Sequence, residues 1–122
     1  MISIIDDDRS VREAVKSLIR SLGYEAVTFA SAEEYLSSDG AHDSECVITD
    51  VQMPGGMTGM DLQDRLIADG YRRPIIFMSA LSTEDAGATA ASPFLRKPFS
   101  DERLIDCLDQ ALNDRAPNSW RF

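Results

Sequence analysis

Five polar residues in this chain of 122 residues follow short apolar runs and could together do phosphoryl chemistry with a metal ion. They are Asp6 and Asp7 after the first run, Asp50 after the third, Ser79 after the fourth and Lys97 after the fifth. Carboxylates without His or Cys partners suit Mg²⁺, which tends to bind one or two carboxylates, waters and a phosphate. A lysine and a hydroxyl could bind the phosphoryl oxygens, and a carboxylate beside the metal could attack phosphorus to form an acyl phosphate.

Each of these residues alone has a simpler interpretation. Aspartates before a helix usually cap it and interact with its dipole, an aspartate before a glycine-rich loop is usually a turn residue, and a lysine before proline is usually solvated. Applied to the whole set, that interpretation would need every side chain to reach the same edge of the fold by coincidence. We therefore interpret the five residues jointly, as one site.

The elements that would position these residues alternate along the chain between strand-like and helix-like patterns. Strands are expected at residues 2–5, 25–29, 46–49, 75–78 and 94–95. This alternation is typical of a parallel sheet between helices, here an α/β three-layer sandwich of five strands. Ligands bind such folds at the carboxyl ends of the strands, where the five candidate residues stand.

Helical periodicity after the strands marks the faces that should be buried. The expected inward residues are Val11, Ala14, Val15, Leu18, Ile19 and Leu22 in the first helix, Ala32, Tyr35 and Leu36 in the second, Leu62, Leu66 and Ile67 in the third, and Leu104, Ile105, Leu108, Ala111 and Leu112 in the last. The expected capping signals are Ser10 with Glu13, Ser31 with Glu34, Ser100, and Gly23 as a helix stop. Residues 83–91 are small and predict only a short, weakly held helix.

Length and composition fit one globular domain, with 43% hydrophobic and 27% charged residues. The formal net charge of −9 argues against direct binding of nucleic acid, which needs clustered Lys and Arg. Cys46 and Cys107 are far apart in sequence and lack metal-binding partners, so we expect two reduced, buried thiols. The first apolar run is too short for a signal peptide or a membrane span, and we expect a cytoplasmic protein without membrane contact.

Motifs at four of the strand ends resemble the receiver domain of two-component response regulators, of the FixJ and chemotaxis (CheY-like) types. They are Ile4-Ile5-Asp6-Asp7-Asp8, Asp50-Val51-Gln52-Met53-Pro54 with Thr58-Gly59, the strand ending in Ser79-Ala80, and Lys97-Pro98-Phe99. The resemblance covers nearly the whole chain and implies a receiver domain at residues 1–113, with a tail or linker stub at 114–122. It also implies a flavodoxin-like sheet with the strand order 2-1-3-4-5.

By this resemblance, Asp50 would accept a phosphoryl group from the phosphohistidine of a histidine kinase or a phosphotransfer protein. Asp7, Asp50 and the main-chain carbonyl of Gln52 would hold Mg²⁺, and Asp6 would act through a bound water. The domain would catalyse only its own phosphorylation and dephosphorylation. It would therefore be a phosphoprotein switch in signal transduction, and not an enzyme with an external substrate.

The same resemblance implies the parts of the switch. Ser79 would be the switch hydroxyl, Lys97 would bind the phosphoryl group, Phe94 would reorient on activation, and the bond between Lys97 and Pro98 would be cis. The phosphoryl oxygens on Asp50 would draw Ser79 and Lys97 toward them. The phosphoryl group can only shift an existing equilibrium between an inactive and an active conformation, by binding one of them better. We therefore expect that a small part of the protein adopts the active-like conformation without it.

Two departures from the family pattern concern loops. Gly55 and Gly56 both follow Pro54, an apparent one-residue insertion that could displace the loop beside Asp50. The segment between Ser79 and Lys97 is shorter than is common in the family, so we expect a shortened fourth helix that is mobile or a single turn and that phosphorylation could order. In the family this helix and the fifth strand help to form an output and dimerisation face, and a homodimer through that face is one expected arrangement.

Two other functions stay open on the sequence alone. A pseudo-receiver of the same fold would take up no phosphoryl group and would bind a kinase or partner domain constitutively, and dependence on metal and phosphate separates the two. A small phosphohydrolase with an aspartyl nucleophile would want a general acid two residues after Asp50, where Gln52 stands. By the resemblance, DNA binding would belong to a helix-turn-helix domain of the kind that commonly follows FixJ-type receivers.

Overall fold

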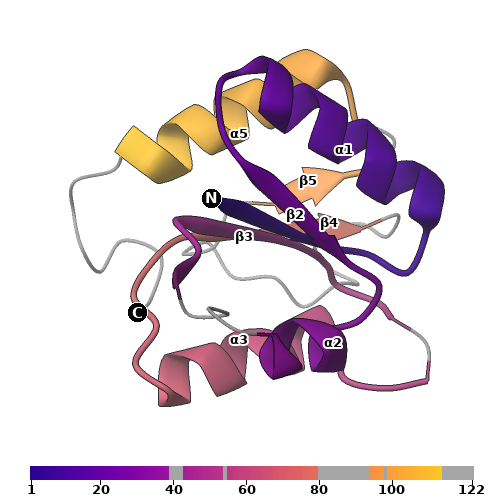
Figure 1. The fold of residues 1–122 in the computed structure, drawn as a ribbon, viewed down its shortest axis with the longest axis vertical. Coiled ribbons are helices and arrows are strands. Elements are labelled where there is room, and N and C mark those ends of the chain that lie inside the picture. The colour runs from indigo at the N-terminus through magenta and orange to yellow at the C-terminus, as the bar shows by residue number, and fades with distance from the viewer. Residues whose placement is uncertain (39–42, 54, 80–93, 98, 114–122) are drawn as a thin grey trace.

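The computed structural model shows a parallel five-stranded sheet with helices on both faces (Figure 1). It describes residues 1–38, 43–53, 55–79, 94–97 and 99–113. The strands are β1 (Ile2–Ile5), β2 (Ala26–Phe29), β3 (Cys46–Asp50), β4 (Ile75–Ser79) and β5 (Phe94–Arg96), in the order β2-β1-β3-β4-β5. The described helices are α1 (Arg9–Ser21), α2 (Ala32–Ser37), α3 (Gly59–Ala68) and α5 (Asp101–Asn113). The expected α/β three-layer fold and strand order are therefore confirmed.

The central strands are buried on both faces, as is usual for parallel strands between two helical layers. Every residue of β1, β3 and β4 is buried, whereas the edge strand β2 is partly exposed. Helices α1 and α5 cover one face of the sheet, and α2 and α3 cover the other (Figure 1). Two apolar cores result, one on each side of the sheet. Each strand begins and ends within one residue of its expected position.

Three of the expected helix-end signals are confirmed. Ser31 Oγ accepts the N–H of Glu34 at 3.0 Å, and Ser100 Oγ accepts the N–H of Arg103 at 3.2 Å. Gly23 follows α1 with a φ of 94°, a left-handed conformation that glycine adopts without steric cost. These short side chains and the glycine satisfy backbone groups that the ends of a helix leave without partners.

The fourth expected signal, the capping pair of Ser10 with Glu13, is wrong. The N-cap of α1 is Asp8. Asp8 has an extended backbone, and its carboxylate accepts the N–H of Ser10 at 2.8 Å. The helix therefore begins before the chain reaches Ser10, and Ser10 and Glu13 lie inside it instead of forming a capping box. The Asp8 N–H donates in turn to Asp6 Oδ1 at 2.8 Å, which ties the start of α1 to the end of β1.

Three residues expected in the core lie at the surface, whereas the other expected inward residues are buried or partly buried. Leu22 is 39% exposed and Ile67 is 37% exposed. Leu22 is the C-cap of α1, beyond its last helical turn, and Ile67 lies one residue past the buried Leu66, where the helix has rotated away from the sheet. Ala14 is exposed because it borders a groove between α1 and α5.

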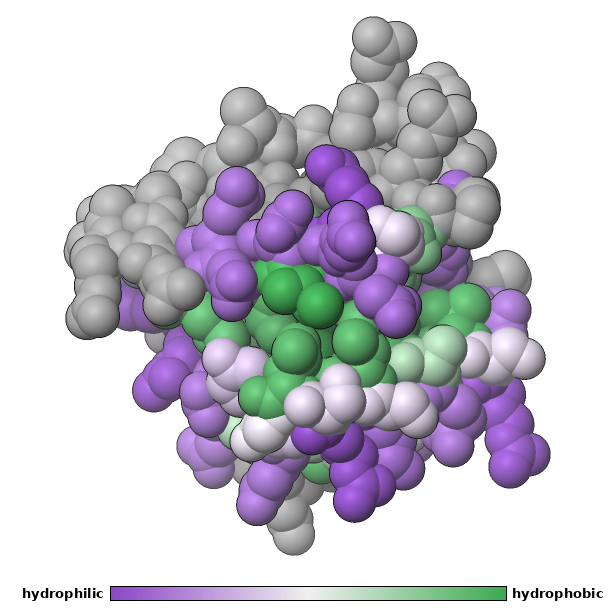
Figure 2. Space-filling model, turned by 90° about the horizontal axis from the view of Figure 1, so that it is seen from above, coloured by the Kyte–Doolittle hydropathy of each residue, from purple (hydrophilic) through white to green (hydrophobic). Residues whose placement is uncertain are grey.

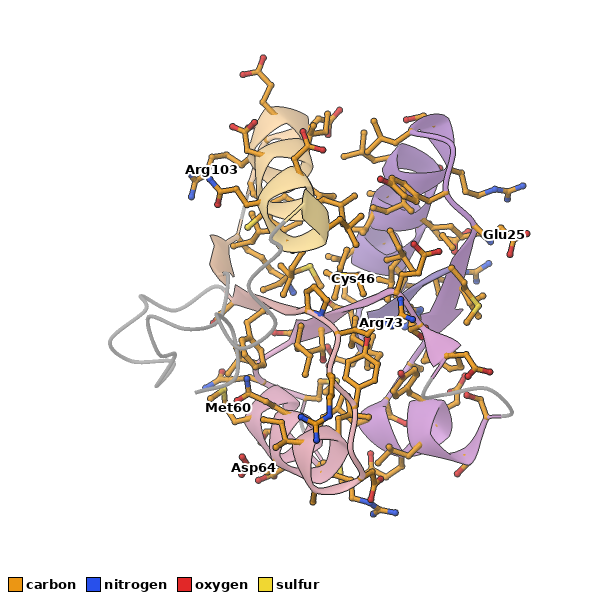
Figure 3. All side chains as sticks on the ribbon, turned by 90° about the vertical axis from the view of Figure 1, so that its left-hand side faces the viewer. Glu25, Cys46, Met60, Asp64, Arg73 and Arg103 are labelled. Atoms are coloured by element: carbon orange, nitrogen blue, oxygen red, sulfur yellow. The ribbon has the colours of Figure 1, made fainter. Side chains whose placement is uncertain are left out.

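The two cysteines are free thiols, as expected. Cys46 is buried at the start of β3, under the layer of α1 and α5 (Figure 3). Cys107 packs against the same core but is only partly buried. Burial raises the pKa of the Cys46 thiol, and the neighbouring Cys107 adds to the effect. Cys46 is therefore held as a neutral thiol inside the apolar core.

Some of the sequence predictions concern residues that the structure does not describe. The short helix expected at residues 83–91, the tail at 114–122 and the bond from Lys97 to Pro98 all lie outside the described ranges. The shortened fourth helix, the dimer face and the boundary of the domain therefore stay predictions. Among the described helices, none has the length and apolar character needed to cross a lipid bilayer.

Candidate functional site

The strand register brings the carboxyl ends of four strands to one edge of the sheet. The last register pairs are Ile5 with Thr49, Asp50 with Met78, and Ser79 with Arg96. Asp6 follows β1, Asp50 and Ser79 end β3 and β4, and Lys97 follows β5. Residues that are far apart in the chain are therefore neighbours at this edge, where parallel α/β sheets bind their ligands.

A single ammonium group joins the first and third strand ends. Lys97 Nζ lies 2.7 Å from Asp6 Oδ2 and 3.1 Å from Asp50 Oδ2. The side chain of Asp6 is fully buried, that of Asp50 is 11% exposed and that of Lys97 is 18% exposed. The Lys97 N–H donates to the Ser79 carbonyl oxygen at 2.7 Å, so the backbone fixes where the lysine leaves the sheet.

Three carboxylates gather at this lysine. Asp6, Asp7 and Asp50 each offer an oxygen, and these oxygens all lie within 4.8 Å of one another. Asp6 and Asp50 are buried, whereas Asp7 is exposed toward solvent. A set of only oxygen donors, with one member open to water, fits a hard cation such as Mg²⁺ that keeps part of its hydration shell.

The electrostatics of the site leave negative charge in excess. Burial raises the pKa of the Asp50 carboxyl; the Lys97 ammonium opposes this shift and the nearby Asp6 adds to it. For Lys97, burial alone would lower the pKa, but the hydrogen bond to Asp6 and the charge of Asp50 outweigh burial and raise it. One ammonium group is therefore shared between two carboxylates, which favours a further cation.

The loop after Asp50 is closed at its base by backbone contacts. The Val51 N–H donates to the Met78 carbonyl oxygen at 2.9 Å, and the Gly59 N–H donates to the Val51 carbonyl oxygen at 2.9 Å. The Gln52 N–H donates to Asp50 Oδ1 at 3.2 Å. One oxygen of Asp50 is thus bound to the loop and the other to Lys97, which orients the carboxylate.

Helix α3 begins directly against the backbone of Asp50. A Cβ at Gly59 would overlap the Asp50 carbonyl oxygen and contact the backbone of Val51, so only glycine fits there. Thr58 and Asp61 form a capping box, with the Asp61 N–H on Thr58 Oγ1 and the Thr58 N–H on Asp61 Oδ2, each at 3.1 Å. The Thr58-Gly59 motif therefore has a local reason, because one residue caps the helix and the next lets it approach β3.

Three contacts near the site were not anticipated from the sequence. Arg12 Nη1 donates to the Asp6 carbonyl oxygen at 2.7 Å, and Asp8 binds Asp6 as described above. Glu33 Oε2 accepts the N–H of Met57, in the loop after Asp50, at 2.8 Å. Arg12 and Glu33 lie on helices that carry no site motif, and the sequence around Glu33 signals only a helix cap.

The other residues predicted for the site are Ser79, Gln52 and Phe94, which lie on or next to strands β3, β4 and β5. Ser79 is buried at the end of β4. Gln52 is exposed two residues after Asp50, and its role as a main-chain metal ligand stays a prediction. Phe94 begins β5 in register with Phe77, and the predicted movement of its ring lies outside the described part of the structure. Ser79 as a switch hydroxyl likewise stays a prediction.

An apolar groove of about 510 Å³ lies between α1 and α5 and extends to Lys97. It is lined by Ser10, Val11, Ala14, Val15, Leu18, Lys97, Phe99, Asp101 and Leu104. Figure 2 shows apolar surface gathered on this face of the molecule, rimmed by hydrophilic residues. The apolar stripe of α1 is therefore only partly covered by its own fold, because Val11 and Leu18 are partly buried and Ala14 is exposed at the groove.

The strand order and the acidic edge define a CheY-like α/β domain. Residues 2–109 match the family model of the response regulator receiver domain, and the chain belongs to this family. The transcriptional regulatory protein TdiR of Thauera aromatica is 36% identical over 113 residues, which cover 89% of this chain and 49% of TdiR. The response regulator protein TmoT of Ectopseudomonas mendocina is 40% identical over 119 residues, which cover 92% of this chain and 52% of TmoT. The chain thus spans about half the length of these curated relatives.

Solved structures agree with this assignment. A response regulator receiver protein from Burkholderia phymatum is 37% identical, with a TM-score of 0.73 over 95% of this chain and 97% of that one. The response regulator protein TrrA from Thermotoga maritima, solved in complex with Mg²⁺ and BeF, is 27% identical, with a TM-score of 0.79 over 91% of this chain and 97% of that one. The resemblance to two-component receivers stated from the motifs is therefore confirmed.

Proposed function

We propose that this chain is a phosphoaccepting receiver of two-component signal transduction, in which Asp50 is the residue that is phosphorylated. The observation that carries the proposal is the Lys97 ammonium, which bridges Asp6 and Asp50 inside the acidic cluster. A cation held against the nucleophilic carboxylate lies where negative charge gathers on the transferred phosphoryl group. Membership of the receiver family supports the same function.

Mg²⁺ would be held by Asp7, Asp50 and the main-chain carbonyl of Gln52, and it would neutralise the phosphoryl oxygens. Asp6 would act through a bound water. This indirect role is supported by its contacts, because Asp6 Oδ1 accepts the Asp8 N–H and Asp6 Oδ2 accepts Lys97, both in the buried part of the site. Asp7, which is exposed, has its carboxylate open to solvent at the mouth of the cluster.

In the transfer step, an Asp50 carboxylate oxygen attacks phosphorus while the bond from phosphorus to the donor imidazole nitrogen breaks. The imidazole keeps the electron pair of that bond and takes up a proton. Lys97 exchanges its contact with the Asp50 carboxylate for a phosphoryl oxygen, and Ser79 supplies a hydroxyl to another. The domain acts only on its own phosphorylation state. The new contacts of Lys97 and Ser79 favour a second conformation, in which the Phe94 ring is proposed to reorient, and this change is the output signal.

The donor would be a histidine kinase or a phosphotransfer protein, and the groove between α1 and α5 supports this choice. The groove is apolar along Val11, Ala14 and Leu18 and ends at Lys97. A donor helix that lies in it would bring its histidine toward Asp50. Direct contact with nucleic acid is not part of the proposal, because the net charge of −9 opposes it.

The proposal is tested by intact-mass measurement after incubation with acetyl phosphate, in Mg²⁺ or in EDTA, on the wild type and on Asp50→Asn. The expected result is one phosphoryl adduct that needs both Mg²⁺ and Asp50. The absence of an adduct, together with no Mg²⁺ binding by titration, would overturn the proposal and favour the pseudo-receiver. The loop with Gly55 and Gly56 would then be the first segment to examine.

A further inference from the structure

The loop between β3 and α3 is held just before the N-cap of α3 by a carboxylate from another helix. Glu33, in the first turn of α2, accepts the Met57 N–H at 2.8 Å across 24 positions of the chain. This N–H is the main reason why the pKa of the Glu33 carboxyl lies below its ordinary value. The contact joins the α2 layer to the segment that follows Asp50.

The two consecutive glycines of this loop make the contact possible. Gly55 has a φ of 86°, which a residue with a side chain rarely adopts. At Gly56, a Cβ would lie 2.5 Å from the Glu33 carboxylate oxygen, so a side chain there would displace Glu33. One glycine turns the chain and the next leaves room for the carboxylate, which gives both residues of the apparent insertion a structural role.

The same loop is also anchored on both sides beside the candidate metal site. The Gly59 N–H binds Val51 and the Gln52 N–H binds Asp50, while the side chain of Met53 is buried in the core next to α3. Gln52 lies five positions before Met57 along this short loop. Met57 lies two positions before Gly59, whose N–H binds the carbonyl oxygen of the Val51–Gln52 peptide, so a shift of Met57 would reach that peptide group.

We infer that Glu33 is a positioning residue for the metal site: by holding Met57, it keeps the Gln52 carbonyl oriented for Mg²⁺. This inference rests on the proposed function of Asp50. Loss of Glu33 frees the Met57 N–H but leaves Asp6, Asp50 and Lys97 with their mutual contacts. The affinity for Mg²⁺ should therefore fall, whereas the rate of phosphorylation at saturating Mg²⁺ should not.

The test compares the wild type with Glu33→Ala, Glu33→Gln and Glu34→Ala. For each protein, the Mg²⁺ dissociation constant is measured by NMR titration of backbone amides, and the rate of phosphorylation by acetyl phosphate is measured over a range of Mg²⁺ concentrations. Glu33→Ala should raise the dissociation constant about three- to tenfold, the equivalent of one lost hydrogen bond. Glu33→Gln keeps an acceptor oxygen and should behave as the wild type. Glu34→Ala removes the same charge from the same helical turn and should also leave Mg²⁺ affinity unchanged.

Gly56→Ala provides a second, independent arm. Its Cβ should push Glu33 aside and raise the Mg²⁺ dissociation constant as Glu33→Ala does, and the two changes together should cost no more than Glu33→Ala alone. A wild type that is phosphorylated alongside a Glu33→Ala variant with unchanged Mg²⁺ affinity would overturn the positioning role and leave the proposed function intact. Equal effects of Glu33→Ala and Glu34→Ala would overturn it too, because charge would then be the cause. A wild type that neither binds Mg²⁺ nor takes up a phosphoryl group would instead overturn the proposed function.

Discussion

At the scale of single residues, Lys97 compensates two carboxylates that the fold removes from water. Asp6 is fully buried and Asp50 nearly so, and both accept a hydrogen bond from the same ammonium group. Burial of an ion pair does not in itself stabilise a protein, but removal of one partner leaves the other charge without compensation. The site is therefore sensitive to loss of its lysine in a way that an exposed ion pair is not.

We predict that Lys97→Met lowers the free energy of unfolding by about 2–4 kcal/mol in EDTA near neutral pH. Urea denaturation monitored by circular dichroism measures the loss. Lys16→Met is the matched control, because Lys16 is the other lysine of the chain and lies on α1; it should change stability by less than about 0.5 kcal/mol. Equal losses in the two variants would show that the bridge in the structure has no energetic role. Added Mg²⁺ should restore part of the stability of Lys97→Met.

The contact of Glu33 with Met57 predicts a pH dependence. The folded pKa of Glu33 is lowered below its ordinary value of 4.5, chiefly by the Met57 N–H. A lowered folded pKa means that the contact stabilises the protein above the unfolded pKa and is lost as the pH falls through the folded pKa. The Met57 amide resonance should therefore stay constant from neutral pH and shift with a midpoint below 4.5. An NMR titration measures the midpoint, Glu33→Gln should abolish the step, and a midpoint at or above the ordinary value would contradict the prediction.

At the scale of elements, α3 is placed by how closely its first residue approaches β3. Gly59 lies against the backbone of Asp50, which cannot move without disturbing the end of the strand. We predict that Gly59→Ala costs about 1–3 kcal/mol of unfolding free energy through overpacking. Gly56→Ala is the matched control, because its added Cβ meets only the flexible end of the Glu33 side chain, and it should cost less. Chemical denaturation of both variants tests the order, and a larger loss for Gly56→Ala would contradict it.

Helix α1 illustrates how an element can serve both the core and a surface. Val15 and Ile19 are buried against the sheet, whereas Ala14 lies exposed at the groove that leads to Lys97. We predict that Ala14→Arg slows phosphorylation by a protein phosphodonor at least about tenfold. The arginine side chain would fill the groove and prevent the donor protein from making its contacts there. Phosphorylation by acetyl phosphate should be unchanged. Ser17→Arg, exposed on the same helix outside the groove, is the control, and an equal effect of both variants would exclude the groove as the docking surface.

At the scale of the whole molecule, the acidic site should couple metal binding to stability. A ligand that binds only the folded state stabilises it by about 1.4 kcal/mol for each tenfold rise in concentration above its dissociation constant. We predict this dependence for Mg²⁺ in the wild type, with a much smaller dependence in Asp50→Asn. Because the net charge is −9, sodium chloride at equal ionic strength is the control for general screening. Equal stabilisation by both salts would contradict a specific metal site.

Much of the fold could be predicted from the sequence because its determinants are local. The apolar runs of the strands and the helical stripes are short-range patterns, and the strand ends came within one residue of their expected positions. Ser31 and Ser100 were recognised as caps for the same reason. The start of α1 was misassigned because two capping signals compete there, and Asp8 precedes Ser10.

The sequence by itself also determined which residues stand at the strand ends, and hence the residue types of the candidate site. Only the tertiary structure decided how they meet: Lys97 reaches Asp6 across 91 positions of the chain, and Glu33 reaches Met57 across 24. The exposure of Ala14 likewise depends on where α5 packs beside α1. The physical reason is that local patterns encode backbone conformation and burial, whereas a hydrogen bond between distant segments depends on strand register and helix packing, which no short stretch of sequence contains.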